Sequence, residues 1–127
     1  KSMHRDQAEY YLELVGLKDL INQKAATLSH GQLRLLEVAI ALTLKPKVFI
    51  MDEPMAGLGS DGTKQMTNFL DTLRNRAPIL LVEHDMDAVF ALANRITVLD
   101  YGRVIASDTV GSIKKAPAVQ KAYLGEG

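Results

Sequence analysis

Two short apolar runs, each followed by charged or polar residues, stand out in the hydrophobic pattern of the chain. Residues 48–51 read Val-Phe-Ile-Met and are followed by Asp52 and Glu53. Residues 79–82 read Ile-Leu-Leu-Val and are followed, two positions later, by His84. Short apolar runs rich in β-branched side chains are typical of strands that are buried on both faces of a parallel sheet. The pattern therefore predicts two such strands.

The segment between these runs has helical periodicity, with apolar residues on one face through residues 66–73. Ser60 or Asp61 is the expected cap of this helix. A strand, a helix and a second strand form a crossover unit, in which the strands are parallel and their carboxyl ends lie at one edge of the sheet. We therefore expect the two acids and His84 to share that edge, which is where ligands bind in open α/β sheets.

A Ser-x-x-Gln pair predicts the start of another helix, because Ser29 and Gln32 have capping-box spacing directly before an apolar run. The helix is expected to run to about Leu44, where Lys45-Pro46 disfavours its continuation. Apolar residues cover most of its faces, which predicts a largely buried helix. Gly31 permits close approach to the free amides of the first turn, which suit an anion. An ordinary capped helix without a ligand has the same pattern.

The flanking segments complete an α/β fold. Residues 8–15 have the spacing of a short helix that stops at Gly16. Residues 95–99 and 103–106 surround turn residues and predict a β-hairpin, and two short helices are expected after it. The fold class is therefore α/β, with parallel core strands, helices and a C-terminal hairpin.

Composition narrows the function classes. The 127 residues carry 15 basic and 15 acidic side chains and no cysteine. The absence of cysteine excludes a disulfide scaffold and a cysteine-based zinc site, and the balanced charge gives no support to a nucleic-acid partner. The most apolar window, residues 33–44, falls short of the about 20 residues that span a bilayer.

Four motifs in order carry a family resemblance. They are Leu28-Ser29-His30-Gly31-Gln32, the run from Val48 to Glu53, Ala56-Gly57-Leu58-Gly59, and Glu83-His84-Asp85. Together they resemble the C-terminal half of an ABC-type ATPase domain, which has a P-loop NTPase-like fold. Within this family, four stretches are most similar to ATPase subunits of bacterial branched-chain amino acid importers: Asp52–Leu58, Val82–Asp87, Val98–Gly102 and Ala122–Gly125. Neighbouring importers, including urea importers, have similar sequences.

The resemblance implies roles for the residues at the sheet edge. Asp52 matches the residue that supports Mg²⁺, usually through water, and Glu53 matches the general base for the attacking water. His84 matches the switch histidine that touches the γ-phosphate of ATP. These implied roles agree with the chemistry of the side chains, since carboxylates bind hard cations and accept protons, and imidazole can bond to phosphate.

The resemblance also implies contacts across a dimer. Ser29, Gly31 and Gln32 match the signature that contacts the γ-phosphate of a nucleotide held by the other subunit, and residues 56–59 match the loop that crosses the dimer interface. His30 stands where the family usually has glycine. Gly59 stands where Asp or Asn is common, which weakens the expectation of a polar contact from this loop.

The 127 residues contain no G-x-x-x-x-G-K-[ST] phosphate loop. The resemblance therefore implies a C-terminal fragment: part of the helical signature subdomain at 1–44, part of the ATPase core at 45–110, and C-terminal helices at 111–127. We expect the parent to hydrolyse ATP with Mg²⁺ and the isolated fragment to be inactive.

The expected partners are a second ATPase subunit, membrane permease subunits and, indirectly, an extracytoplasmic solute-binding protein, at the cytoplasmic face of the bacterial inner membrane. One alternative is an ABC ATPase of another pathway, such as DNA repair or translation. A non-catalytic interaction domain that kept the fold is a second alternative.

Overall fold

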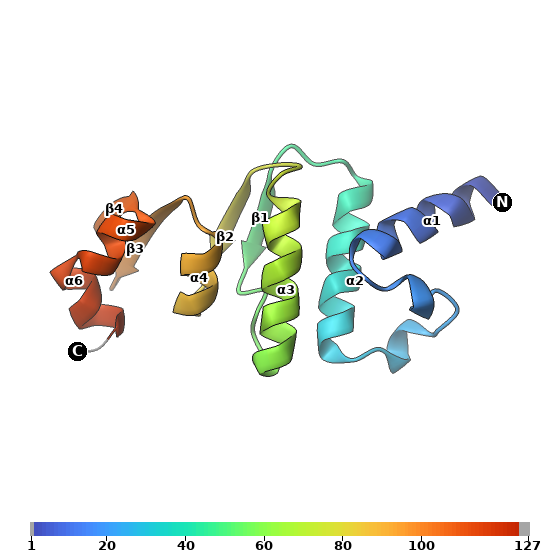
Figure 1. Cartoon of the computed structure of the whole chain (residues 1–127), viewed down its shortest axis with the longest axis horizontal. Helices are drawn as coiled ribbons and strands as arrows, with labels where there is room; N and C mark the ends of the chain where they lie inside the picture. The colour runs from blue at the N-terminus through green and yellow to red at the C-terminus, as the bar shows by residue number, and fades with distance from the viewer. Residues whose placement is uncertain (1, 125–127) are drawn as a thin grey trace. The chain divides into compact units, whose positions relative to one another are not determined.

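The computed structural model describes residues 2–124, which divide into two compact units between Asp85 and Met86 (Figure 1). The first unit contains the predicted crossover, and the second contains the predicted hairpin. The model confirms the mixed α/β fold class. The finer division at residues 44/45 and 110/111 concerns a longer ATPase domain and stays a prediction.

The first unit begins with two helices that pack on each other. Helix α1 covers Ser2–Leu14 and ends before Gly16, whose φ of 78° terminates it. Two short 3₁₀ turns, η1 (Lys18–Leu20) and η2 (Ala25–Thr27), lead to helix α2 (His30–Thr43). Ser29 is the N-cap of α2 and forms the predicted capping box.

The strand–helix–strand unit follows. Strands β1 (Phe49–Asp52) and β2 (Ile79–Val82) are parallel, with Phe49 opposite Ile79 and Asp52 opposite Val82. Helix α3 (Gly59–Leu73) connects them and lies beside α2 (Figure 1). This arrangement confirms the predicted parallel pair and places both carboxyl ends at one edge.

The prediction that both strands are buried on both faces is wrong. Ile50, Leu80 and Val82 are 74%, 58% and 52% exposed. Phe49 is buried, whereas its neighbour Ile50 is open to solvent. Because successive side chains of a strand point to opposite faces, one face of the two-stranded sheet is covered and the other is uncovered.

Helix α2 is also less buried than its apolar sequence predicts. Leu35, Ala39 and Leu42 are buried, but Ile40 is 59% exposed. Packing against its neighbours covers one stripe of the helix, so the apolar residues on the remaining surface face solvent.

Helix α3 begins earlier than its sequence predicts. Its N-cap is Leu58, which makes no side-chain cap bond, and Gly59 is already helical. Ser60 and Asp61 therefore lie inside the first turn, and the prediction that either caps the helix is wrong. The chain turns into the helix because the Leu58 N–H donates to the Met55 carbonyl. The apolar face is confirmed, and its buried residues are Met66, Leu70 and Leu73.

The second unit contains helix α4 (Met86–Leu92) and an antiparallel hairpin of β3 (Arg95–Asp100) and β4 (Arg103–Thr109). Tyr101 and Gly102 have φ of 48° and 75°, which is the geometry of a tight two-residue hairpin turn. Helices α5 (Val110–Lys115) and α6 (Pro117–Val119) and the π-helical turn η3 (Gln120–Leu124) follow. The core of this unit contains Val98, Ile113 and Val119. Across residues 2–124, no helix combines the length and apolar character needed to cross a membrane.

Candidate functional site

The carboxyl edge of the parallel pair carries the acids that follow β1. Asp52 is the last residue of the strand and is exposed. The Glu53 N–H donates to the Val82 carbonyl at 2.7 Å, which adds one more bond between the two strands. Glu53 has a φ of 49°, a left-handed conformation that is uncommon for a residue with a side chain. Such strained residues are frequent at functional sites.

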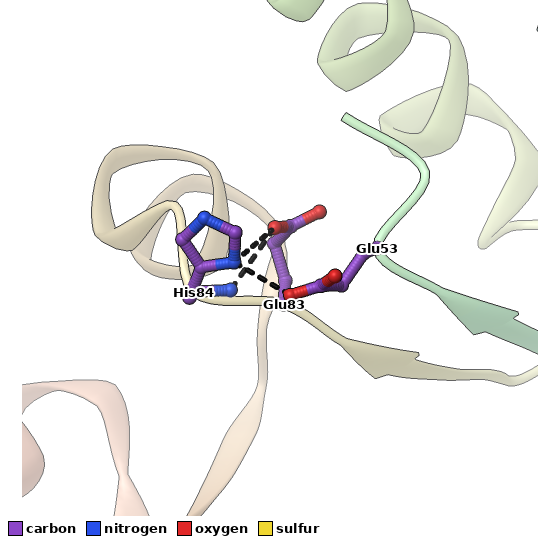
Figure 2. A group of neighbouring side chains, drawn as sticks. All are labelled: Glu53, Glu83 and His84. Atoms are coloured by element: carbon purple, nitrogen blue, oxygen red, sulfur yellow. Dashed lines mark hydrogen bonds and ion pairs between the residues drawn. The ribbon is translucent and has the colours of Figure 1, made fainter. Parts of the chain in front are cut away.

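Glu53 and His84 form a direct pair, as Figure 2 shows, with 2.7 Å between Glu53 Oε1 and His84 Nδ1. The His84 side chain is 71% exposed and that of Glu53 is 47% exposed, so the pair is open to solvent. The hydrogen bond and the negative charge of Glu53 raise the pKa of His84 above 6.5, with smaller contributions from the charges of Glu83 and Asp85. Desolvation of the ring by neighbouring atoms lowers the pKa and offsets this increase only in part.

Glu83 is a member of this site that the sequence argument did not single out. Its side chain is only 1% exposed, and its Oε1 lies 3.7 Å from His84 Nδ1. The His84 N–H donates to Glu83 Oε1 at 3.0 Å, and the Met55 N–H donates to Glu83 Oε2 at 3.3 Å. The available signal was a charged residue at the end of an apolar run, directly before the candidate histidine.

In the described part of the chain, one group of side chains could together act as ligands of a metal ion. Ligand atoms of Glu53, Glu83 and His84 all lie within 4.8 Å of one another. The oxygens of Glu83 already accept backbone N–H bonds, and its side chain is buried, which makes this group a poor ion cage. Asp52 lies outside the group but is exposed at the same edge, and its carboxylate suits a hydrated Mg²⁺.

The predicted signature residues lie at the start of α2. Ser29 Oγ accepts from the Gln32 N–H at 3.2 Å, and Gln32 Oε1 accepts from the Ser29 N–H at 2.9 Å. Gly31 is the second residue of the helix, and a Cβ there would lie 3.7 Å from the Leu58 side chain. Within residues 2–124, no hydrogen bond or ion pair links Ser29 or Gln32 to Glu53 or His84.

The structure does bring the signature next to the loop at 56–59. A Cβ placed on Gly57 would lie 3.3 Å from Nε2 of His30, which is closer than most Cβ contacts. Gly57 also has a φ of 74°. The two segments that the resemblance assigns to a dimer interface are therefore neighbours in one unit.

Comparisons with known proteins show what the chain is similar to. Residues 3–56 match the family model described as ABC transporter. The chain is 39% identical over 123 residues to the high-affinity branched-chain amino acid transport ATP-binding protein LivG of Escherichia coli, and 37% identical to BraF of Pseudomonas aeruginosa. Each alignment covers 95% of this chain and 48% of the relative.

A solved structure shows the same fold. The crystal structure of the ADP conformation of MJ1267, an ATP-binding cassette of an ABC transporter, superposes with a TM-score of 0.82 and 31% identity. The match covers 95% of this chain and 50% of that one. The chain thus spans about half the length of the relatives it matches. Over that half, the sequence and the fold of the chain match those of ABC transporter ATP-binding proteins.

Proposed function

We propose that this chain is part of a longer ATP-hydrolysing subunit of an ABC importer, in which it supplies the general base and the switch histidine. The Glu53–His84 pair at the carboxyl edge of β1 and β2 is the observation that carries the proposal. The pair joins a carboxylate and an imidazole at the edge of a sheet where ligands bind. The phosphate-binding loop of the same subunit would come from outside these 127 residues.

In this proposal Glu53 orients the attacking water and accepts its proton, and the 47% exposure of its side chain gives that water access. His84 uses Nδ1 for Glu53, and Figure 2 shows its second ring nitrogen turned away from the carboxylates. The raised pKa of His84, caused mainly by Glu53, favours the imidazolium. In that form Nε2–H donates a hydrogen bond to the γ-phosphate of ATP.

Asp52 would support the Mg²⁺ that accompanies ATP, through water, since its carboxylate is exposed at the end of β1. When bound, this ion would neutralise negative charge on the phosphates.

The start of α2 would contact the γ-phosphate of ATP held by a second subunit. Ser29 Oγ accepts a bond within the capping box, so its own O–H remains able to donate to a phosphate oxygen. Gly31 leaves the backbone open to close approach, and Gln32 holds the first turn in shape. The positive end of the helix dipole favours the anion.

The partners and the transported compound are proposed from the relatives. LivG and BraF are named for transport of branched-chain amino acids. We propose the same substrate class for the importer that contains this chain. Its assembly would include a second ATPase subunit, membrane permease subunits and an extracytoplasmic solute-binding protein, with this chain on the cytoplasmic face of the bacterial inner membrane.

The test is Mg-ATPase activity of the complete subunit that contains these residues. Glu53→Gln is expected to retain ATP binding and to lose about 10²–10⁴-fold in turnover, because a general base contributes that much. Glu37→Gln is the matched control, since it removes the same charge from an exposed position of α2. Unchanged turnover in Glu53→Gln would remove Glu53 from the proposed role. The 127 residues alone are expected to show no ATP hydrolysis.

A further inference from the structure

Glu83 has an unusual environment for an acidic side chain, because it is 1% exposed beside two exposed residues of the site. We propose that Glu83 is a positioning residue that ties the loop after β1 to the loop after β2 and thereby sets the separation of Glu53 and His84. The catalytic consequence of this tie depends on the proposed ATPase function, whereas the tie itself does not.

The hydrogen bonds of Glu83 reach both loops. Its Oε2 accepts from the N–H of Met55, two residues after Glu53. Its Oε1 accepts from the N–H of His84 at 3.0 Å and of Asp85 at 3.4 Å. One carboxylate therefore bonds to the backbone beyond Glu53 and to the backbone that carries the imidazole. Figure 2 shows the bond to the His84 backbone.

The bonds of Glu83 lie just beyond the last backbone hydrogen bond between β1 and β2. Among the described residues, the backbone bonds between the strands end where the Glu53 N–H meets the Val82 carbonyl. Beyond that point the chains separate, and Glu53 and His84 lie in the two diverging loops. The Glu83 carboxylate continues the connection one step further and holds the diverging backbones together.

The length and chemistry of glutamate both suit this role. A carboxylate offers only acceptors on its two oxygens, so it can bind amide N–H groups on both sides. In Glu83→Gln one side presents an NH₂ group, which cannot accept from an N–H. In Glu83→Asp the charge is kept, but the side chain is shorter by one methylene and cannot reach both loops. The two variants therefore separate the tie from the charge.

A double-mutant cycle on the pKa of His84, followed by NMR titration of its ring, tests the tie. Glu53→Gln is expected to lower the pKa of His84 because it removes the main cause of the raised value. The lowering should be smaller in the Glu83→Gln and Glu83→Asp backgrounds, because the loops are then free to separate. An equal lowering in all backgrounds would overturn the proposal. Full coupling in Glu83→Asp and reduced coupling in Glu83→Gln would overturn it too, because only the charge would then act.

Activity provides the second measurement. In the complete subunit, both Glu83 variants are expected to lower kcat by about 10–100-fold with little change in KM, since small displacements of reacting groups cost that much. The exposed Glu37→Gln variant should leave both constants unchanged. A lower melting temperature with unchanged kcat and an unchanged His84–Glu53 coupling would show a merely structural role. The Glu83 variants could change the His84–Glu53 coupling as expected while ATPase activity does not depend on Glu53. That result would support the tie and contradict the proposed function.

If a variant fails to fold, amide hydrogen exchange of the unmodified protein tests the tie instead. The Met55 amide lies in a loop, and its expected protection comes from Glu83 Oε2. Exchange of this amide that is slowed to a rate comparable with that of the strand amides supports the tie. Exchange of the Met55 amide at the rate of an unstructured peptide would overturn it.

Discussion

The backbone at position 53 is expected to favour glycine over alanine. Its φ is 49°, and the left-handed region costs a residue with a Cβ about 1–2 kcal/mol. Glycine avoids this cost, but its greater freedom in the unfolded chain offsets about 0.4–1 kcal/mol. Subtracting the second term from the first leaves Glu53→Gly more stable than Glu53→Ala by about 1 kcal/mol. Both variants lose the contact with His84 equally, so the difference isolates the backbone.

Urea denaturation of the two variants measures this difference as a change in midpoint at constant slope. Lys45 is a positive control because its φ is also 49°. The free energy of unfolding of Lys45→Gly should exceed that of Lys45→Ala by a similar amount. Glu37 is the opposite control, since it lies within α2 and glycine there should be less stable than alanine by about 1 kcal/mol. If alanine equals or exceeds glycine at position 53 while Lys45 behaves as expected, the left-handed conformation of Glu53 is refuted.

Three further outcomes are expected. Ser29→Ala should lower the free energy of unfolding by about 0.5–2 kcal/mol in urea titrations, and Ser29→Asp should cost less because it keeps an acceptor for the cap. Gly57→Ala should be more destabilising than Gly59→Ala by about 1 kcal/mol. The two glycines have similar φ values of 74° and 72°, but only position 57 lies against the His30 ring. The difference should therefore vanish in a His30→Ala background. The raised pKa of His84 means that its pairing stabilises the fold below the ordinary pKa and that this contribution is lost as pH rises through the raised value. His84→Gln should therefore cost more stability at about pH 5.5 than at about pH 8.5.

Local signals predicted the elements that carry the site. The apolar run at residues 79–82 coincides with β2, and the Ser-x-x-Gln pair forms the capping box at the start of α2. The parallel strands of a crossover unit have their carboxyl ends at one edge, which predicts that Glu53 and His84 lie there, and the two are in contact. These predictions succeed because hydrophobic period, capping and strand direction depend on residues that are close in sequence.

Burial was harder to predict because it depends on what packs against each element. In the sequence, Ile50 looks as apolar as its buried neighbour Phe49, and Ile40 of α2 looks as apolar as the buried Ala39. Ile50 and Ile40 nevertheless face solvent. The periodicity of a single element shows which residues share a face, but not whether that face is covered. Glu83 was missed for a related reason. Its side chain bonds to Met55, which lies 28 positions away in the sequence. A local sequence pattern does not indicate such a contact.

His30 shows how a departure from a family pattern can have a structural counterpart elsewhere in the chain. The resemblance expects glycine at this position, and an imidazole there needs space. The ring lies against Gly57, where a Cβ would come within 3.3 Å of Nε2 and the φ of 74° already favours glycine. A side chain at position 57 would therefore meet both backbone strain and the ring. This proximity places the start of α2 beside the loop before α3. If these segments face a second subunit as proposed, His30 and Gly57 belong to the same interface.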